Sequence, residues 1–214
     1  MRSRTSIPEE TMKIICIGRN YGEHAKELGN EQPDEPVVFL KPTSALTPLG
    51  GPIVLPDFSN EIHHEIELVY SIRRHNGRAE ADRVTIGLDL TARDVQQALK
   101  SKGLPWEKAK AFDGSAYVGE AFTALDSFPP GHHIDFMLKK NGHVVQSGHN
   151  GQMIFGVATL IAHVERYMQL ETGDLIFTGT PAGVGPLQAG DRLEGFLLGD
   201  LVFDLEVKRA ATPR

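Results

Sequence analysis

EIELVYS, residues 65–71, is the stretch of sequence that decides how this chain folds. Ile66, Leu68 and Tyr70 alternate with Glu65, Glu67 and Val69, which is the two-residue period of a β-strand. One face of the predicted strand is apolar and suits a core, whereas the other carries two carboxylates side by side. Like charges so close together either raise a pKa or require a counter-cation. We therefore predict a strand with a cation beside its glutamates.

A hard divalent cation is the physical match for this carboxylate pair, because Mg²⁺, Mn²⁺ and Ca²⁺ prefer oxygen ligands. A catalytic site needs only a few carboxylates, with open positions for water and substrate. The E-x-E spacing alone is weak evidence, since most such pairs are solvated outer faces of strands. His63 and His64 precede the pair, and alternation places only His63 on the glutamate face. For both we favour imidazoles that support neighbouring side chains or are satisfied in the core over zinc ligands.

Other short apolar runs separated by turn residues predict further strands. They lie at residues 13–17, 37–40, 53–55, 84–90, 175–177, 192–198 and 201–207. Asn141-Gly142 suits a two-residue type I′ turn and predicts a hairpin over residues 134–146. Many short strands of this kind favour a rolled or barrel-like sheet. Asp89 lies in the run at 84–90, but its distance from the glutamate pair does not follow from the sequence.

Three segments have helical features. A brief helix is expected over residues 23–28, ended by Gly29, and Thr91 is a candidate N-cap for a second helix that runs towards Gly103. Apolar residues recur at helical spacing over 153–168 and predict an amphipathic helix packed on the sheet. We interpret this stripe as core and not as a cofactor site. Its members are Met153, Ile154, Val157, Leu160, Ile161, Val164 and Met168.

Length and composition fit one substantial domain, since 214 residues with 40% hydrophobic content can form a continuous core. We expect a flexible tail over residues 1–12 and a single domain over 13–208. The start of the chain has no apolar signal region, and no stretch of about 18 apolar residues predicts a membrane span. The single cysteine, Cys16, excludes an intramolecular disulfide and fits a cytoplasmic protein. A net charge of -6 without a basic stripe makes nucleic acid an unexpected partner.

Five ordered motifs carry more specific information. They are GRNY (18–21), HEIEL (64–68), LDLTARDVQ (88–96), GLPWEKAK (103–110) and LIFTGTPAGVGP (175–186). Together they resemble the fumarylacetoacetate hydrolase family, over residues 13 to about 207. The resemblance implies an α+β, β-rich fold, a mixed β-roll with flanking helices, and a homodimer. The last motif is not a phosphate-binding loop, because it lacks the Lys-Ser/Thr ending and precedes a predicted strand.

The resemblance also implies the chemistry of the site. It places Mg²⁺ or Mn²⁺ on Glu65, Glu67 and Asp89, with Ca²⁺ as a substitute in crystals. His24 and Glu27 match a dyad on a short helix, where the i, i+3 spacing lets Glu27 orient His24 as a base for water. From spacing alone this dyad is a common surface pair.

A lysine and several polar side chains complete the implied site. Lys110 matches the family's active-site lysine, which would stabilise the enolate and carboxylate oxygens of the product. Without the resemblance Lys110 is one of several exposed lysines, and Arg93 forms an ion pair with Asp94 or another surface acid. The residues matched to substrate contacts, or to the fingerprint around them, are Arg19, Tyr21, Arg93, Gln96 and Thr180.

The activity implied by the resemblance is metal-dependent hydrolysis of an acylpyruvate such as fumarylpyruvate or acetylpyruvate. His24 would activate a water that attacks the distal carbonyl, and the carbon–carbon bond would break to release pyruvate and a carboxylic acid. The same site could instead decarboxylate oxaloacetate, or isomerise or hydrate a 2-oxo-dienoate. A metal-binding protein without catalysis is a third class. Residues 112–130 and 148–152 resemble the family only loosely, so we expect them to shape the pocket for a particular substrate.

Overall fold

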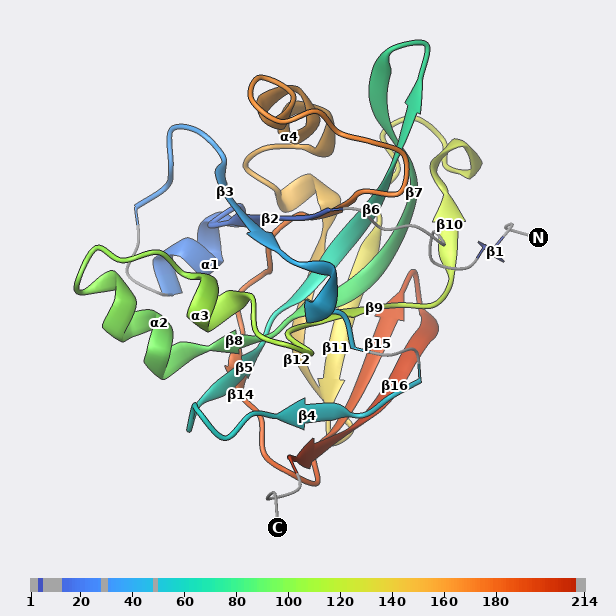
Figure 1. Ribbon diagram of the computed structural model, residues 1–214. Helices are drawn as coiled ribbons and strands as arrows, with labels where there is room; N and C mark the ends of the chain where they lie inside the picture. Colours follow the sequence, from blue (N-terminus) through green and yellow to red (C-terminus); the bar gives the residue numbers. More distant parts are fainter. Residues whose placement is uncertain (1–3, 6–12, 28–30, 48–49, 211–214) are drawn as a thin grey trace.

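The EIELVYS stretch leads into β6 (Ile66–His75), a central strand of an eight-stranded sheet in the computed structural model (Figure 1). The structure describes residues 4–5, 13–27, 31–47 and 50–210. The other strands of this sheet are β1 (Arg4–Thr5), β2 (Ile14–Gly18), β3 (Val37–Lys41), β7 (Arg78–Asp89), β9 (Ala116–Val118), β10 (Phe122–Ala124) and β13 (Leu175–Phe177). Their order is β1-β10-β7-β6-β13-β2-β3, with β9 beside β7. The central strand β6 is antiparallel to both β7 and β13.

The predicted alternation along β6 is confirmed, and both faces of the strand are buried. Ile66, Leu68 and Tyr70 belong to one core cluster, whereas Val69 belongs to a second cluster with Cys16. Burial raises the pKa of the Cys16 thiol well above its usual value, and the negative charge of Asp89 adds to this effect. The carboxylates on the second face are therefore not on a solvated outer surface.

A five-stranded sheet packs against the apolar face of β6. Its strands, in order, are β12 (His143–His149), β11 (Asp135–Lys140), β15 (Arg192–Leu197), β16 (Asp200–Arg209) and β4 (Ile53–Leu55). Phe136 and Leu138 lie in the core cluster that contains Leu68. The predicted hairpin is confirmed, because Asn141 and Gly142 join β11 to β12 with φ values of 54° and 79°.

The fold also contains a third, small sheet and several short helices. Some of these elements lie around the carboxyl end of β7, and the others cover the large sheet. The small sheet has the order β14 (Gly185–Pro186), β5 (Ile62–His64), β8 (Thr91–Ala92). The α-helices are α1 (Gly22–Glu27), α2 (Arg93–Lys100), α3 (Glu107–Lys110) and α4 (Val157–Val164), and the 3₁₀ helices are η1 (Thr43–Ala45), η2 (Leu125–Ser127) and η3 (Asn150–Gln152). Figure 1 shows α2 and α3 side by side at one end of the large sheet and α4 apart from them. This arrangement confirms the predicted β-rich α+β fold with flanking helices.

The predicted N-cap of α2 is wrong. Thr91 belongs to β8, where pairing with β5 keeps its backbone extended, and its hydroxyl donates to the carbonyl of Asp89 at 3.2 Å. The N-cap position is Ala92, whose side chain makes no capping hydrogen bond.

The helix predicted over residues 153–168 is much shorter, because α4 spans only Val157–Val164. Gly156 is extended, and the amides of Ile154 and Phe155 donate to the backbone and side chain of Asn20 instead of entering a helix. The apolar stripe is nevertheless core, as predicted, since Leu160, Ile161 and Val164 pack with residues of β2 and β13.

Some predictions fall outside what the structure describes. Residues 1–3 and 6–12 of the predicted tail and the predicted end of the first helix at Leu28 and Gly29 are among these, while Arg4–Thr5 pair with β10. No helix within the described residues has the length and apolarity that crossing a membrane requires. The single-domain boundary, the cytoplasmic location, the homodimer and the absence of a nucleic-acid partner stay predictions.

Candidate metal centre and active site

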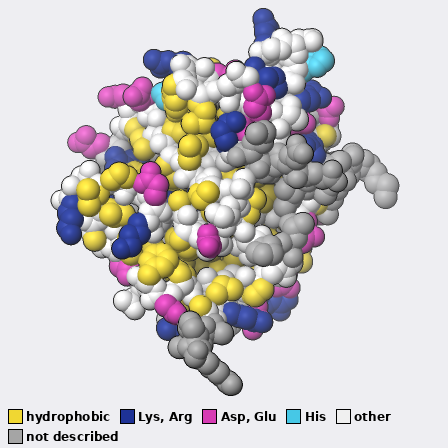
Figure 2. All heavy atoms as spheres, in the orientation of Figure 1, with side chains coloured by type: hydrophobic (Ala, Val, Ile, Leu, Met, Phe, Trp, Pro, Cys, Tyr) yellow, Lys and Arg dark blue, Asp and Glu magenta, His cyan; other side chains and the backbone are white. Residues whose placement is uncertain are grey.

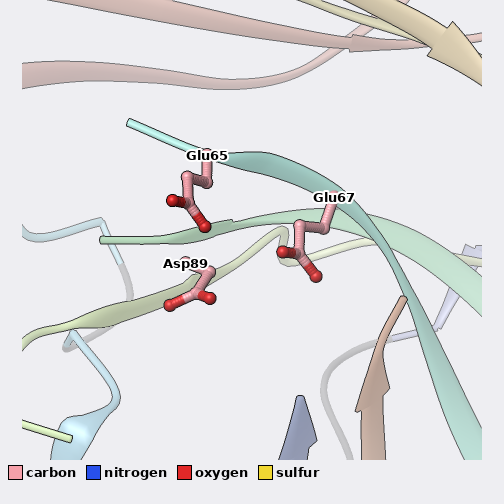
Figure 3. Close-up of side chains that lie close together, drawn as sticks. All are labelled: Glu65, Glu67 and Asp89. Atoms are coloured by element: carbon pink, nitrogen blue, oxygen red, sulfur yellow. The ribbon is translucent and has the colours of Figure 1, made fainter. Parts of the chain in front are cut away.

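Three carboxylates meet where β6 begins and β7 ends (Figure 3). Glu65, Glu67 and Asp89 are buried, and each offers an oxygen that lies within 4.8 Å of those of the other two. The antiparallel register of β6 and β7 explains the meeting, since Ile66 pairs with Leu88 and the amide of Asp89 donates to the carbonyl of Glu65 at 2.9 Å. This register was the information that the sequence lacked.

The electrostatics of the cluster fit a hard cation. Burial raises the pKa of the Glu67 carboxyl well above its usual value, and the charges of Asp89 and Glu65 raise it further. Burial alone would also raise the pKa of Glu65, but the positive charges of Lys110 and Arg93 outweigh it and lower that pKa. All three ligand groups are carboxylates, which is the donor set of Mg²⁺, Mn²⁺ or Ca²⁺ and not of a soft metal. The residues present therefore fit a divalent metal of this class.

Two predicted basic residues contact the carboxylates directly. The Lys110 ammonium lies 2.7 Å from Glu65 Oε2 and 2.6 Å from Asp89 Oδ2. Arg93 donates to Glu65 and, at 2.7 Å, to Gln96 Oε1. The alternatives of an exposed lysine and of an Arg93–Asp94 ion pair are both wrong, because Lys110 is buried and Arg93 pairs with the buried Glu65.

The predicted dyad lies beside the carboxylate cluster. His24 Nδ1 is 3.1 Å from Glu27 Oε2, and the carboxylate of Glu27 also accepts a hydrogen bond from the amide of Gly183. His24 is only 6% exposed and lines a cavity of about 40 Å³ together with Glu65, Glu67 and Asp89. His24 is therefore a buried residue of the same site, although the half-exposed Glu27 reaches the surface.

The family model described as "Fumarylacetoacetate (FAA) hydrolase C-terminal" matches residues 13–202. The chain belongs to this family. Because the match includes the carboxylate cluster, the dyad and the five motifs, the family resemblance is confirmed.

Individual members of the family are similar over nearly the whole chain. The mitochondrial oxaloacetate tautomerase FAHD1 of Bos taurus is 41% identical over 203 residues, covering 92% of this chain and 91% of the relative. Oxaloacetate tautomerase YcgM of Escherichia coli is 40% identical over 188 residues, with 85% and 86% covered. A fumarylpyruvate hydrolase from Pseudomonas aeruginosa, solved in complex with Mn²⁺ and pyruvate, has a TM-score of 0.83, is 32% identical, and shares 98% and 97% of the two chains.

The remaining residues matched to the family fingerprint lie in two places. Arg19, Gln96 and Thr180 line the cavity, and the Thr180 hydroxyl donates to the carbonyl of Ile66 at 2.8 Å. Tyr21 is not among the residues that line this cavity. It packs edge-to-face on Phe136 with ring centroids 6.4 Å apart, and burial raises the pKa of its hydroxyl.

Two buried side-chain amides, which the sequence analysis missed, form hydrogen bonds that fix the segments carrying these fingerprint residues. Asn20 donates to the carbonyls of Phe155 and Thr178 at 3.0 and 2.8 Å. Gln146 receives hydrogen bonds from the His64 ring and the Ile66 amide, and it donates to Thr180 Oγ1 at 2.8 Å. Asn20 could have been found because it lies inside the GRNY motif, whereas nothing in the hairpin sequence marks Gln146.

The two histidines before the glutamate pair do not join the cluster. His64 is buried and lies 2.9 Å from Gln146, while His63 lies 2.8 Å from Glu61. Burial lowers the pKa of both rings, which favours their neutral form. The interpretation of His64 as a satisfied core histidine is confirmed.

Lys41 is a buried cation of the site that the sequence analysis also missed. Its ammonium lies 2.8 Å from Asp89 Oδ1, and its side chain is 0% exposed. It also donates to the carbonyl of Lys110 and, at 3.1 Å, to the carbonyl and hydroxyl of Ser115. Lys41 therefore joins the third carboxylate to the C-terminal end of α3. From sequence it is only the last residue of an apolar run.

Replacing Lys41 with methionine should lower the free energy of unfolding by about 3–5 kcal/mol, because Asp89 and two carbonyls lose a buried partner. Chemical denaturation monitored by circular dichroism would measure this loss. The matched control is Lys208→Met, which removes an exposed lysine 3.1 Å from Glu206 and should change stability by less than about 1 kcal/mol. Equal effects of the two variants would contradict the role given to Lys41.

Gly179 positions Glu67, one of the two glutamates of the cluster. Its amide donates to Glu67 Oε2 at 2.7 Å, and its φ of 94° favours glycine. A Cβ atom at this position would lie 2.9 Å from Asn20 Cβ and 3.2 Å from the carbonyl of Ile17. Only glycine therefore fits here without displacing the loop.

We expect Gly179→Ala to lower the free energy of unfolding by about 1–3 kcal/mol and to weaken Mn²⁺ binding about tenfold. Thermal denaturation and a Mn²⁺ titration would measure the two effects. Gly190→Ala is the control, since Gly190 has a similar φ of 95° but no neighbouring atom within 4 Å of the added carbon. It should reproduce part of the stability loss and none of the metal loss. Unchanged metal binding in Gly179→Ala would show that the Glu67 contact is dispensable.

Proposed function

We propose that this protein is a Mg²⁺- or Mn²⁺-dependent enzyme that acts on a small 2-oxo acid by stabilising its enolate. The observation that carries the proposal is that His24, whose ring contacts Glu27, lines the same cavity as the carboxylate cluster. A base held by a carboxylate beside a metal site is the arrangement that proton transfer next to a carbonyl requires.

Different side chains of this chain have different roles in the proposed reaction. A bound divalent ion would supply Lewis-acid stabilisation to the 1-carboxylate and 2-oxo oxygens of the substrate. Lys110 is buried beside the cluster and can donate to an oxygen that gains negative charge. Arg93 and Gln96, which are hydrogen-bonded to each other, provide further donors for a carboxylate. Glu27 on Nδ1 fixes the orientation of His24 and leaves Nε2 to accept a proton.

Hydrolysis of an acylpyruvate is the first candidate reaction. His24 takes a proton from a water molecule, whose oxygen bonds to the distal carbonyl carbon. The bond between that carbon and C3 then breaks, and its electron pair passes to the enolate of pyruvate. The enolate takes the proton back from His24 at C3, so that the products are pyruvate and a carboxylic acid. The dyad supports this candidate, because the reaction needs a base for water.

Interconversion of the keto and enol forms of oxaloacetate is a close second candidate. The two oxaloacetate tautomerases named above are 40–41% identical to this chain, whereas the fumarylpyruvate hydrolase is 32% identical. In this reaction His24 removes a proton from C3 and a proton returns to the 2-oxo oxygen, or the reverse, and no carbon–carbon bond breaks. Decarboxylation of oxaloacetate differs again, because it releases carbon dioxide and leaves the pyruvate enolate.

One set of assays separates these reactions. Protein freed of metal with a chelator is supplied with Mg²⁺ or Mn²⁺ and given acetylpyruvate, fumarylpyruvate or oxaloacetate. Pyruvate release from acetylpyruvate or fumarylpyruvate reports hydrolysis, decay of the enol absorbance of oxaloacetate without pyruvate reports tautomerisation, and carbon dioxide release from oxaloacetate reports decarboxylation. Metal-dependent turnover of at least one substrate is the expected result. Metal-bound protein that turns over none of them would contradict the proposal and favour a binding protein without catalysis.

A further inference from the structure

Among the residues that the structure describes, two of the four cations that line the cavity have no carboxylate partner. Arg93 and Lys110 are paired with the cluster, as described above. Arg19 and Lys100 also line the cavity, but neither forms an ion pair with a carboxylate of the described residues. Figure 2 shows basic side chains next to apolar ones over the region of α2 and α3. The cavity therefore carries positive charge beyond what its own carboxylates neutralise.

Lys100 belongs to the same helix face as the residues expected to bind the first carboxylate. Arg93, Gln96 and Lys100 are at positions i, i+3 and i+7 of α2, so they project from one side of the helix. Lys100 is about 6 Å further along the axis than Gln96. Its half-buried stem lies beside Trp106, with the ammonium 5.3 Å from the ring centroid. The apolar wall thus holds the charge close to the cavity instead of letting it extend into water.

Arg19 has two features of a residue held for a ligand. Its Nε is buried and has no hydrogen-bond partner within the described part of the chain, which is a costly state for a charged donor. Its backbone has a φ of 59°, an uncommon conformation for a residue with a side chain. Burial lowers the pKa of Lys100, and the positive charges of Arg19 and Arg93 lower it further. The positive charges of Arg19 and Lys100 repel each other, and the Nε of Arg19 lacks an acceptor among the described residues. An anionic group between the two side chains would relieve the repulsion and accept a hydrogen bond from this Nε.

We propose that Arg19 and Lys100 bind a second carboxylate of the substrate, so that the site prefers 2-oxo acids with two carboxylates to those with one. The inference rests on the proposed function, which puts the 1-carboxylate and the 2-oxo group of the same molecule at the carboxylate cluster. Arg19 supplies a planar guanidinium for paired hydrogen bonds, and Lys100 supplies a point charge. The competing explanation is that Lys100 only covers the face of Trp106.

Substrates that differ in charge test the proposal. Fumarylpyruvate carries two carboxylates and acetylpyruvate carries one, and both are candidates for the same bond cleavage. Lys100→Gln should lower kcat/KM for fumarylpyruvate about tenfold, mainly through KM, and leave acetylpyruvate within about twofold. Lys100→Arg should retain most of the fumarylpyruvate activity. Lys102→Gln, which removes an exposed lysine two residues away, should change neither substrate.

Equilibrium binding keeps the test independent of turnover. Calorimetry on Mn²⁺-loaded protein compares pyruvate with 2-oxoglutarate, which carry one and two carboxylates. The intact chain should bind 2-oxoglutarate more tightly than pyruvate. Lys100→Gln should reduce the ratio of the two affinities about tenfold. If pyruvate binds but Lys100→Gln weakens both ligands equally, or neither, the second-carboxylate site is wrong while the proposed function stands. If neither ligand binds to the metal-loaded protein, the proposed function fails as well.

Discussion

Replacing His24 with asparagine should reduce turnover by roughly 10²–10⁴-fold, which is the usual contribution of a general base. Among the described residues, His24 is the only histidine that lines the cavity, and its ring contacts the carboxylate of Glu27. No neighbouring histidine ring can therefore replace it. Mn²⁺ affinity should change by less than about twofold, because the expected metal ligands are the three clustered carboxylates and not His24. Steady-state kinetics on the most active substrate and a Mn²⁺ titration measure the two quantities.

A matched control and a conservative variant make this prediction sharper. His75 is exposed at the end of β6, so His75→Asn should leave turnover and metal binding unchanged. Glu27→Gln keeps a hydrogen bond to His24 but removes the charge, and it should lower turnover by a smaller factor than His24→Asn. Full turnover in His24→Asn with intact metal binding would exclude the dyad as the base.

Replacing Asp89 with asparagine should abolish activity at Mn²⁺ concentrations that saturate the intact protein. The substitution removes one of three clustered carboxylates and leaves Lys41 and Lys110 each without one ion-pair partner. We expect the apparent Mn²⁺ affinity to fall by more than about 100-fold, since even residues that only support a metal ligand contribute about 10–100-fold. Calorimetric titration of chelator-treated protein with Mn²⁺ measures this change.

The control for Asp89 is Asp126→Asn, an exposed carboxylate in η2 that should leave Mn²⁺ affinity and turnover unchanged. Addition of chelator to the intact protein should cause the same loss of activity as Asp89→Asn, and excess Mn²⁺ should reverse only the chelator's effect. Intact activity after complete removal of metal would contradict a metal-dependent reaction, and normal affinity in Asp89→Asn would remove this residue from the site.

The local patterns of the sequence predicted much of the fold. Period-two alternation identified β6, and Asn141-Gly142 identified the β11–β12 hairpin, because both signals depend only on neighbouring residues. The limits of α4 could not be predicted, since the preceding amides bond to Asn20, more than a hundred residues earlier in the chain. The N-cap assigned to Thr91 failed for a similar reason, because pairing with β5 competes with helix capping.

The candidate site, like the fold, has some features that local sequence predicts and others that depend on tertiary contacts. Two like charges on one strand face indicated a cation, but the register that brings Asp89 to them is a tertiary fact. The motifs supplied Asp89, Lys110 and the dyad through their resemblance to a family. Lys41 and Gln146 were missed because a lysine at a strand end and a glutamine in a hairpin are ordinary surface residues by pattern. Burial alone distinguishes them.

The pairing of Ile66 with Leu88 has a practical consequence for any preparation of this protein. A slip of one residue between β6 and β7 would turn every side chain of a strand to its opposite face, so the three carboxylates would no longer converge. An aggregated or misregistered chain keeps the same composition and the same mass but loses the ion-binding stoichiometry. With Mn²⁺ bound at the proposed site, the molar ratio of bound Mn²⁺ to polypeptide would therefore count the correctly folded molecules in a sample.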